Sequence, residues 1–514
     1  MVKRWLLGLL VVALLALGAG AALAQDVNLT PFEDETFGFN TLVPEGWQTV
    51  APGVRTRAST TTDFAVLAQQ SAPLSAADLL PSILPQLGLT EAPESVGTYS
   101  SAALNWTLYK IDVAQGGISV TVDLALAETE GRTYIVLLQA APEEYDALHA
   151  SVFVPVLDAL APRVEAPAED VPYLVEEVTF ANGDITLAGT LTLPATEGPA
   201  PAVVLVTGSG PQDRDESLLP VAAIKPFALI ADALTRAGIA VLRYDDRGVG
   251  ESTGDFDSAT SADFATDAAA AITYLKGRPE INAAEIGVLG HSEGGMVASI
   301  LGVSNPDIAF IISLAGPSAP ITELMLKQNE RILQSDGASA EAIESQLAYL
   351  REAFPLAVSG DTAALETLTY ETTLAQTAMM SEEERTALGD IEAFARNAAE
   401  QAVATLATPW FRYFLTSVPA DDWSRISVPV LAIYGGLDVQ VDAEQNVAAF
   451  EAAMQAGGNP DYQVVTFPNA NHLMQAAVTG SLNEYGTLEQ TFIPELMPTI
   501  IEWLLARVTV QAAS

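Results

Sequence analysis

Hydrophobic and polar residues are arranged in two different patterns along the chain, and the pattern changes near residue 175. Before that point, short runs alternate apolar and polar residues, which is typical of half-buried strands that pair antiparallel. These runs cover 37–44, 64–70, 107–114, 118–128 and 133–140. Two longer stretches, 75–89 and 143–161, indicate helices. Residues 26–165 are therefore predicted to form a small α+β domain.

The second pattern begins after a linker. The stretch 161–172 has the proline and charge of a connecting segment, and the linker is placed at 166–174. Two strand-like runs then flank Asn182-Gly183, a pair typical of tight hairpin turns. Strand-like and helix-like runs follow one another at 202–210, 226–238, 239–246, 264–277, 286–292, 309–316, 429–436 and 462–468. Repeated β-α units predict a mainly parallel sheet with helices on both faces, within a domain that spans 175–512.

The β-α pattern stops between residue 318 and about residue 425. This stretch is rich in Ala, Leu and Glu and is predicted to be wholly helical. A helical insertion after a core strand suggests a cap over the sheet. Its aromatic residues fit the lining of a substrate pocket and fit the core of the cap equally well: Trp410, Phe411, Tyr413 and Phe414.

The first 24 residues have the three parts of a signal peptide. Lys3 and Arg4 supply a basic start, an apolar run begins at Trp5, and Ala22-Leu23-Ala24 forms a cleavage signal before Gln25. We therefore expect a secreted or periplasmic, extracytoplasmic protein without stable membrane association after cleavage. An uncleaved anchor is the alternative, because the apolar run approaches the length of a membrane span.

The net charge and the cysteine content limit the kinds of binding partner and site that the chain can have. The chain has 22 Lys and Arg against 65 Asp and Glu, so its formal net charge is −43. Such a surface repels phosphate backbones, so no nucleic-acid partner is expected. A hydrophobic content of 49% argues against a disordered acidic protein. The absence of cysteine from the sequence excludes disulfides and thiolate metal sites. The composition carries no sign of oligomeric state.

The pattern Gly-x-Ser-x-Gly occurs twice, at 250–254 and at 290–294. A strand that turns sharply into a helix holds a serine at a strained point of the backbone, and glycines two places away leave room for the turn. Ser292 follows a strand-like run and precedes a helix-compatible stretch. Ser252 follows a polar loop, and no helix begins directly after it. Ser292 is therefore the predicted nucleophile.

A serine hydroxyl needs a base to accept its proton and an acid to orient that base. The chain has three histidines. His149 lies in a predicted helix of the first domain and is interpreted as structural, whereas His291 adjoins Ser292 and points away from its hydroxyl in an elbow. His472 directly follows the strand-like run 462–468, at the sheet edge where parallel strands collect ligands. It is the predicted base.

The predicted acid is Asp438, just past the run 429–436. Asp442 is the near competitor, but it precedes a helical stretch and fits a helix N-terminus better. Ser292, Asp438 and His472 then stand in the chain order that the α/β-hydrolase fold requires. The predicted fold class is an α/β-hydrolase fold with a helical cap insertion, preceded by a small α+β domain.

Six motifs in this order resemble bacterial α/β-hydrolases of the secreted esterase and serine aminopeptidase-like group. They are GSGPQDRDE at 208–216, RYDDRGVGESTGDF at 243–256, GHSEGG at 290–295, PWFRYFL at 409–415, LDVQV at 437–441 and NHLMQ at 471–475. The resemblance implies Ser292 as the nucleophile, His472 as general base and then acid, and Asp438 as the orienting carboxylate. It also implies a helical cap over the site.

The predicted oxyanion hole uses the backbone N–H of Glu293 and a second N–H from the loop 207–210. Ser209 is the first choice for that second donor and Gly210 the second choice. Thr207 stands where many relatives have histidine, which leaves both choices open. The side chain of Glu293 is expected to favour the helix N-terminus.

Two pairs of adjacent, oppositely charged residues in these loops are interpreted as structural ion pairs rather than as substrate contacts. One is Asp213 with Arg214, and the other is Asp246 with Arg247.

These residues predict a serine carboxylester hydrolase that acts on a small-molecule ester, with short acyl chains favoured, and needs no metal or organic cofactor. An aminopeptidase-like enzyme of the same fold is the alternative. It would have to pair the substrate's buried ammonium group with a carboxylate, for which Asp213 and Asp215 are the candidates. A non-catalytic binding protein on a hydrolase scaffold is a third hypothesis, because a fold alone does not establish function.

Overall fold

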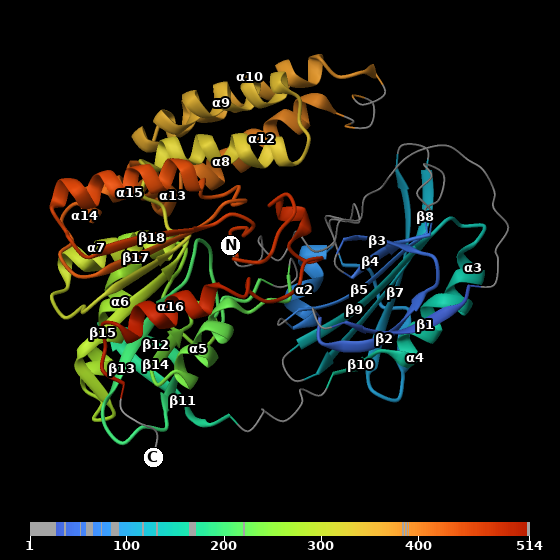
Figure 1. Cartoon of the computed structure of the whole chain (residues 1–514). Coiled ribbons are helices and arrows are strands. Elements are labelled where there is room, and N and C mark those ends of the chain that lie inside the picture. The colour runs from blue at the N-terminus through green and yellow to red at the C-terminus, as the bar shows by residue number, and fades with distance from the viewer. Residues whose placement is uncertain are drawn as a thin grey trace. The chain divides into compact units, whose positions relative to one another are not determined.

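The computed structural model describes residues 27–34, 37–51, 53–57, 65–72, 75–83, 92–115, 118–129, 132–163, 171–218, 222–382, 385, 388 and 390–510 (Figure 1). The predicted signal peptide at 1–24 lies outside the described residues, as does the part of the predicted linker before residue 171. The chain divides into two compact units. The first is Met1–Glu169 with Leu219–Ala223, and the second is Asp170–Leu218 with Ile224–Ser514.

The first unit contains two antiparallel sheets. One sheet has the order β1-β2-β10, and the other has the order β3-β4-β5-β9-β8-β7-β6. The strands are β1 (Leu29–Asp34), β2 (Phe39–Pro44), β3 (Gln48–Ala51), β4 (Val54–Thr56), β5 (Val66–Ala72), β6 (Gly97–Ser100), β7 (Asn105–Gln115), β8 (Ile118–Thr129), β9 (Arg132–Ala140) and β10 (Ala161–Pro162). The helices are α2 (Ala76–Ile83), α3 (Tyr145–Leu148), the π-helix η3 (His149–Phe153) and α4 (Val154–Ala159).

The sequence pattern predicted one antiparallel sheet here, whereas the structure has two. An alternating run shows which residues share a face, but it does not show which strand is the pairing partner. Both faces of the larger sheet are covered. Phe39 of β2 and Val152 of η3 pack on one face, and Leu79 of α2 packs on the other.

The second unit contains a mixed eight-stranded sheet of order β11-β12-β14-β13-β15-β16-β17-β18. Its strands are β11 (Tyr173–Asn182), β12 (Ile185–Pro194), β13 (Ala200–Val206), β14 (Ala240–Tyr244), β15 (Ile281–His291), β16 (Ile311–Leu314), β17 (Val430–Gly435) and β18 (Tyr462–Phe467). The first two strands form the predicted hairpin and pair antiparallel, and β12 pairs antiparallel with β14. From β14 onward neighbouring strands are parallel.

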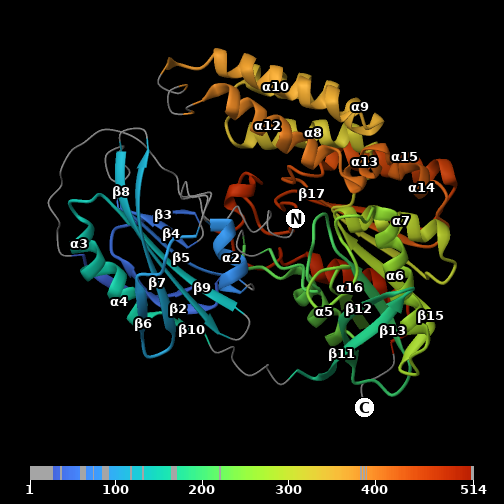
Figure 2. The same cartoon turned by 180° about the vertical axis from the view of Figure 1, so that it is seen from behind.

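Helices cover both faces of this sheet, as the alternating pattern predicted (Figure 2). Helices α5 (Pro226–Arg236) and α16 (Leu496–Leu505) pack on one face, where Phe227 and Trp503 belong to one apolar cluster. The other face is covered by α6 (Ser261–Lys276), α7 (Glu293–Ser304), α14 (Pro419–Trp423) and α15 (Ala443–Gly457). Every residue of the inner strands β13 and β17 is buried, because a parallel sheet covered on both sides has no solvent face at its centre.

The predicted cap is an array of helices formed by the part of the chain that connects β16 to β17 (Figure 1). Before α14 it contains α8 (Ile321–Ser335), α9 (Ala340–Ser359), α10 (Thr362–Ala378), α12 (Ile391–Leu406) and α13 (Pro409–Thr416). It has a small core of its own, in which Phe354 and Phe411 lie buried. The side chains of Ser339, Asp361 and Asp390 accept backbone N–H groups at the starts of α9, α10 and α12, which fixes where these helices begin. In the part of the chain that the structure describes, no helix is long and apolar enough to cross a membrane.

Candidate active site

Ser292 lies at a strained turn between β15 and α7. Its φ of 53° and ψ of −122° put a residue with a side chain in a region that usually holds glycine. Glycines on both sides permit the turn. A Cβ at Gly290 would lie 2.0 Å from the carbonyl oxygen of Gly294, and a Cβ at Gly294 would lie 2.1 Å from that of Val206. The predicted strand, elbow and helix are therefore present at this serine.

His472 and Asp438 meet in the loops that follow β18 and β17. His472 Nδ1 lies 2.7 Å from Asp438 Oδ2, and both side chains are buried. The second carboxylate oxygen of Asp438 accepts the backbone N–H groups of Gln440 at 2.7 Å and Val441 at 2.9 Å. Because both oxygens are bonded, the carboxylate is fixed in orientation and holds one nitrogen of the imidazole in turn.

The backbone of His472 is held as well. Its carbonyl oxygen lies 3.0 Å from Nε2 of His291, and its backbone is hydrogen-bonded to the Tyr485 hydroxyl. The rings of His291 and His472 have centroids 4.9 Å apart. Since His291 directly precedes Ser292, the loop of His472 lies beside the serine elbow.

The sheet topology explains why these segments converge. The chain runs from β13 outward to β14 and then returns to β15 on the other side of β13. Such a reversal leaves a crevice at the carboxyl ends of β13 and β15, where open α/β sheets bind ligands. The loop 207–210 follows β13, and Ser292 follows β15.

The three competing residues have other partners. The Ser252 hydroxyl is buried, donates to the carbonyl of Asp245 at 2.7 Å and accepts the N–H of Ala188 at 2.9 Å. His149 of the first unit lies 2.6 Å from Asp123. Asp442 is the N-cap of α15, where it accepts the N–H of Gln445 at 3.0 Å. The last of these positions agrees with the sequence prediction of a helix N-terminus.

The loop 207–209 is held by carboxyl groups from three segments. The Thr207 hydroxyl donates to Asp246 at 2.7 Å, and the Gly208 N–H donates to Glu216 Oε1 at 3.0 Å. The Ser209 side chain is hydrogen-bonded to Glu293. Burial raises the pKa of the Asp246 carboxyl well above its ordinary value, and the nearby Glu293 adds to this effect. The loop is thus anchored at three successive residues.

The Glu293 side chain belongs to the first turn of α7, at the helix N-terminus where the sequence places it. It is 2% exposed, and its Oε1 accepts from the Ser261 hydroxyl at 2.5 Å and from Trp410 Nε1 at 2.8 Å. Burial raises the pKa of this carboxyl, which works against a charged form. It therefore joins the loop residue Ser209 to the cap helix α13.

The backbone N–H groups of Ser209 and Glu293, the predicted oxyanion donors, form no hydrogen bond among the described residues. The Gly208 N–H, by contrast, is already bonded to Glu216. Glu293 opens α7, so its N–H is one of the unpaired donors of a helix start.

Neither predicted ion pair forms, because adjacent side chains of these turns point in different directions. Arg214 pairs with Asp245 at 2.7 Å, and Asp213 accepts the backbone N–H groups of Asp215 and Ser217. Arg247 pairs with Asp267 at 2.7 Å, while Asp246 bonds Thr207. Both arginines keep the predicted structural role with other partners.

Sequence reasoning missed Glu216, Tyr485 and the link between Trp410 and Glu293. Glu216 was visible as part of the motif at 208–216, but nothing in the sequence showed that it turns back to Gly208 and His291. Its φ of 56° is a backbone feature with no sequence signal. Within the described ranges, no group of three or more His, Asp or Glu could hold a metal ion.

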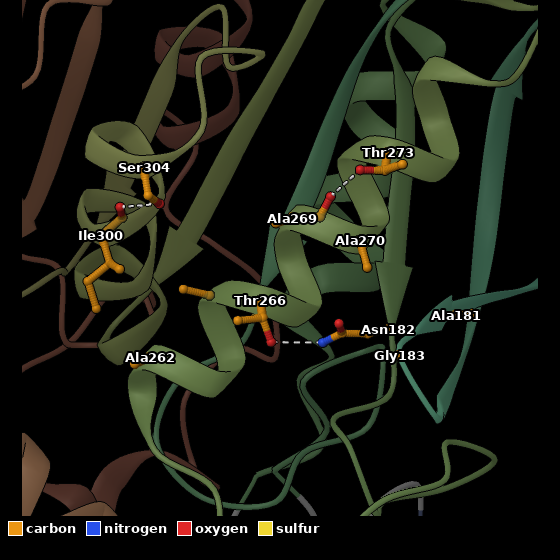
Figure 3. A pocket seen from close by; sticks show the side chains of 11 residues that line it. Ala181, Asn182, Gly183, Ala262, Thr266, Ala269, Ala270, Thr273, Ile300 and Ser304 are labelled. Atoms are coloured by element: carbon orange, nitrogen blue, oxygen red, sulfur yellow. Dashed lines mark hydrogen bonds between the residues drawn. The ribbon is translucent and has the colours of Figure 1, made fainter.

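A groove of about 450 Å³ lies at the other end of α7 (Figure 3). It is lined by Asn182 of the hairpin turn, the alanine-rich face of α6 and the last turns of α7. Its polar groups are occupied, since Asn182 donates to Thr266 at 2.8 Å and the Ser304 hydroxyl donates to the carbonyl of Ile300. The predicted site residues do not line it.

Comparisons with known proteins agree with this architecture. The family described as X-Pro dipeptidyl-peptidase (S15 family) matches residues 146–474. Esterase EstD of Thermotoga maritima is 30% identical over 317 residues, which cover 59% of this chain and 63% of the length of that esterase. Similar solved structures include the Pyrococcus furiosus esterase Pf2001, with 17% identity, a TM-score of 0.42 and coverage of 68% of this chain and 97% of that chain. The α/β hydrolase GrgF from Penicillium has 18% identity, a TM-score of 0.39 and coverage of 66% and 99%. The family match, the mixed sheet with helices on both faces and the helical insertion confirm the predicted fold class.

Proposed function

Because the chain belongs to the X-Pro dipeptidyl-peptidase (S15) family of α/β-hydrolases, we propose that it is a serine hydrolase that cleaves carboxylic esters with short acyl chains. In this proposal Ser292 is the nucleophile, His472 the base and Asp438 the orienting acid. The observation that carries the proposal is the buried His472–Asp438 pair beside a serine in a strained strand-to-helix turn.

The proposed reaction has two halves. His472 Nε2 accepts the hydroxyl proton of Ser292 while Oγ bonds to the acyl carbon, and the imidazolium then gives that proton to the departing alcohol. Water next loses a proton to His472 and attacks the acyl-enzyme, which releases the acid and restores Ser292. Asp438 stays ionised and holds Nδ1–H, so that Nε2 is the free nitrogen.

The negative charge that develops on the acyl oxygen needs donors that are already in place. We assign this role to the backbone N–H groups of Ser209 and Glu293, which are unbonded among the described residues. Gly210 was the second choice for the first donor. Its φ is 97°, in the region that favours glycine. The contacts of Thr207, Gly208 and Ser209 with buried carboxyls keep the loop rigid before substrate binds.

Peptidase activity is the second candidate, because the family takes its description from a dipeptidyl-peptidase. A peptidase that binds the free amino terminus of its substrate must pair the buried ammonium group with a carboxylate. Asp215 was one sequence candidate, and it is paired with Arg243 at 2.8 Å. Asp213 was the other, and its Oδ1 is used within its own loop. Both observations favour esters over amino-acyl amides.

Hydrolysis of p-nitrophenyl acetate and butyrate, compared with proline and alanine p-nitroanilides, tests the proposal. We expect kcat/KM for the esters to exceed that for any amide, and Ser292→Ala or His472→Ala to remove turnover. Ser252→Ala is the matched control and should keep most activity, because its hydroxyl only bridges Asp245 and Ala188. An arylamide turned over faster than both esters would favour the peptidase, and inactivity on every substrate would favour a binding protein.

We also propose that the protein works outside the cytoplasm, on the basis of the signal-like residues 1–24. N-terminal sequencing of the protein exported by a bacterial host should begin at Gln25. Recovery of an intact N-terminus in the membrane fraction would favour the uncleaved anchor.

A further inference from the structure

A second histidine–carboxylate pair lies beside the proposed triad. His291 Nδ1 is 2.7 Å from Glu216 Oε1, the same separation as between His472 and Asp438. Both side chains of this second pair are buried, with exposed fractions of 7% and 1%. The other nitrogen of His291, Nε2, is 3.0 Å from the backbone carbonyl oxygen of His472. The pair therefore contacts the segment that carries the proposed base.

The protons of this pair can be counted from its contacts. A carbonyl oxygen only accepts hydrogen bonds, so Nε2 of His291 must carry a proton to bond His472. The short contact with Glu216 needs another proton, because a bare nitrogen lone pair would repel a carboxylate oxygen. Glu216 Oε1 also accepts the N–H of Gly208 at 3.0 Å. When the proton shared with Glu216 rests on Nδ1, both nitrogens of His291 are protonated and the ring is an imidazolium.

The backbone at Glu216 supports a specific role for this carboxylate. Its φ of 56° lies in the left-handed region, which is unfavourable for a residue with a long side chain. Such strain persists where the surrounding structure needs that side chain in place. From this position one carboxylate reaches both the loop after β13 and the strand end that precedes Ser292.

We propose that His291, held as an imidazolium by Glu216, is a positioning residue that fixes the backbone of His472, and that loss of its proton sets the alkaline limit of activity. The proposal rests on the proposed function, since it takes His472 as the base. When the proton is lost, His291 can keep its bond to Glu216 or its bond to the His472 carbonyl, but not both. Either outcome loosens the loop that aims Nε2 of His472 at Ser292.

The direction of the pH effect follows from the groups around the ring. Glu216, His472 and Asp438 are the titratable groups that act on His291. Burial lowers the pKa of His291, but the charge and hydrogen bond of Glu216, the His472 carbonyl and the charge of Asp438 outweigh it, so the net pKa is raised. The raised pKa keeps the imidazolium present to a higher pH than for an ordinary histidine.

NMR of the full-length protein with isotope-labelled histidine tests the protonation state without any assay of activity. The chain has three histidines, so single substitutions assign every ring signal. We expect the His291 ring to be doubly protonated at neutral pH and to titrate in the alkaline range, and the ring signals of His472 to shift in the same titration. A neutral His291 ring at neutral pH would overturn the proposal even if no substrate were found. So would His472 ring signals that do not change as His291 titrates.

Three variants connect this state to catalysis. Glu216→Gln keeps an oxygen acceptor but removes the charge, so it should lower the pKa of His291 and move the alkaline fall of kcat/KM down by at least about one pH unit. His291→Gln keeps an amide donor for the His472 carbonyl but does not titrate, so it should lower kcat, leave KM unchanged and abolish that fall. His149→Gln is the matched control, because His149 pairs with Asp123 in the first unit and should leave the profile unchanged. An alkaline fall that is identical in wild type and His291→Gln contradicts the positioning role, and circular dichroism confirms that each variant is folded.

Discussion

At the scale of single residues, backbone strain gathers around the candidate site. Among the described residues, four with side chains have a positive φ in the left-handed range, and they are Glu216, Ser292, Ala315 and Met474. Ser292 is the proposed nucleophile, Glu216 bonds the residue before it, and Met474 lies two residues after His472. Strain of this kind costs of order 1–3 kcal/mol at each position, so the surrounding contacts must offset it. Its concentration here supports a functional site.

Substitution of the two competing aspartates tests the proposed acid. Asp438→Asn should lower kcat by about 10⁴-fold, because an amide that faces His472 stabilises the wrong imidazole tautomer. Asp442→Asn is the matched control and should leave kcat unchanged, since asparagine also caps helices and can accept the N–H of Gln445. Steady-state kinetics on p-nitrophenyl butyrate measures both. A large loss in Asp442→Asn with a mild one in Asp438→Asn would reverse the assignment.

The sequence supplied candidate residues for the site but not their contacts. Ser292, Asp438 and His472 each follow a strongly apolar strand, and strand ends of a parallel sheet must meet at one edge. Glu216 and Tyr485 lie in irregular loops, where periodicity carries no information about direction. Their contacts with His291 and His472 depend on how several loops fold over one another, which only the structure displays.

At the scale of secondary-structure elements, the core strands and helices were predicted because their patterns are strong. A fully buried parallel strand such as β17 is a short apolar run, and α15 begins at an Asp that caps it. The cap was predicted only as a helical stretch, because the pairing of its helices depends on packing. The contact that joins α13 to the oxyanion loop, from Trp410 through Glu293 to Ser209, was therefore not foreseen.

Two variants of Trp410 and Glu293 test this link. Trp410→Phe removes one donor to Glu293 and should cost about 1 kcal/mol of stability. Glu293→Ala leaves the buried Ser261 hydroxyl and the half-buried Trp410 indole without an acceptor and should cost more, at about 1–3 kcal/mol for the buried donor. Both should lower kcat on short esters, because Glu293→Ala removes the carboxyl that contacts Ser209 and Trp410→Phe removes a hydrogen bond that holds this carboxyl in place. Thermal unfolding and ester kinetics measure these effects, and a kcat unchanged in Glu293→Ala would show that the link is structural only.

The raised pKa of Glu293 also makes a prediction about stability. The folded state holds a proton that the unfolded chain releases above the ordinary glutamate range, so the free energy of unfolding should fall as pH rises from about 4.5 towards the folded pKa. Glu293→Gln keeps the accepting oxygen and cannot titrate, so its melting temperature should decline less steeply with pH than that of wild type. Equal slopes would show that Glu293 is already ionised at the start of this range.

At the scale of the whole molecule, the proposed site residues all belong to one of the two compact units. Ser209, Ser292, Asp438 and His472 lie in the second unit, together with the cap helices. The first unit has its own sheets and core, in which Tyr145 and His149 each form a hydrogen bond with Asp123. The sequence pattern predicts a change of architecture near residue 175, where alternating runs give way to β-α repeats, and the compact units divide between Glu169 and Asp170.

Removal of the first unit should therefore leave the chemistry intact. A chain that begins at Val171 keeps the whole eight-stranded sheet, the cap and every proposed catalytic group, so its kcat/KM on p-nitrophenyl acetate should match that of the full-length enzyme. The truncated chain should also react with a fluorophosphonate, which reports the nucleophilic serine independently of substrate fit. A truncated protein that melts cooperatively but neither labels nor turns over the ester would mean that the first unit completes the site. If it labels but hydrolyses the ester slowly, the first unit acts on substrate binding, and a raised KM with unchanged kcat would identify that role.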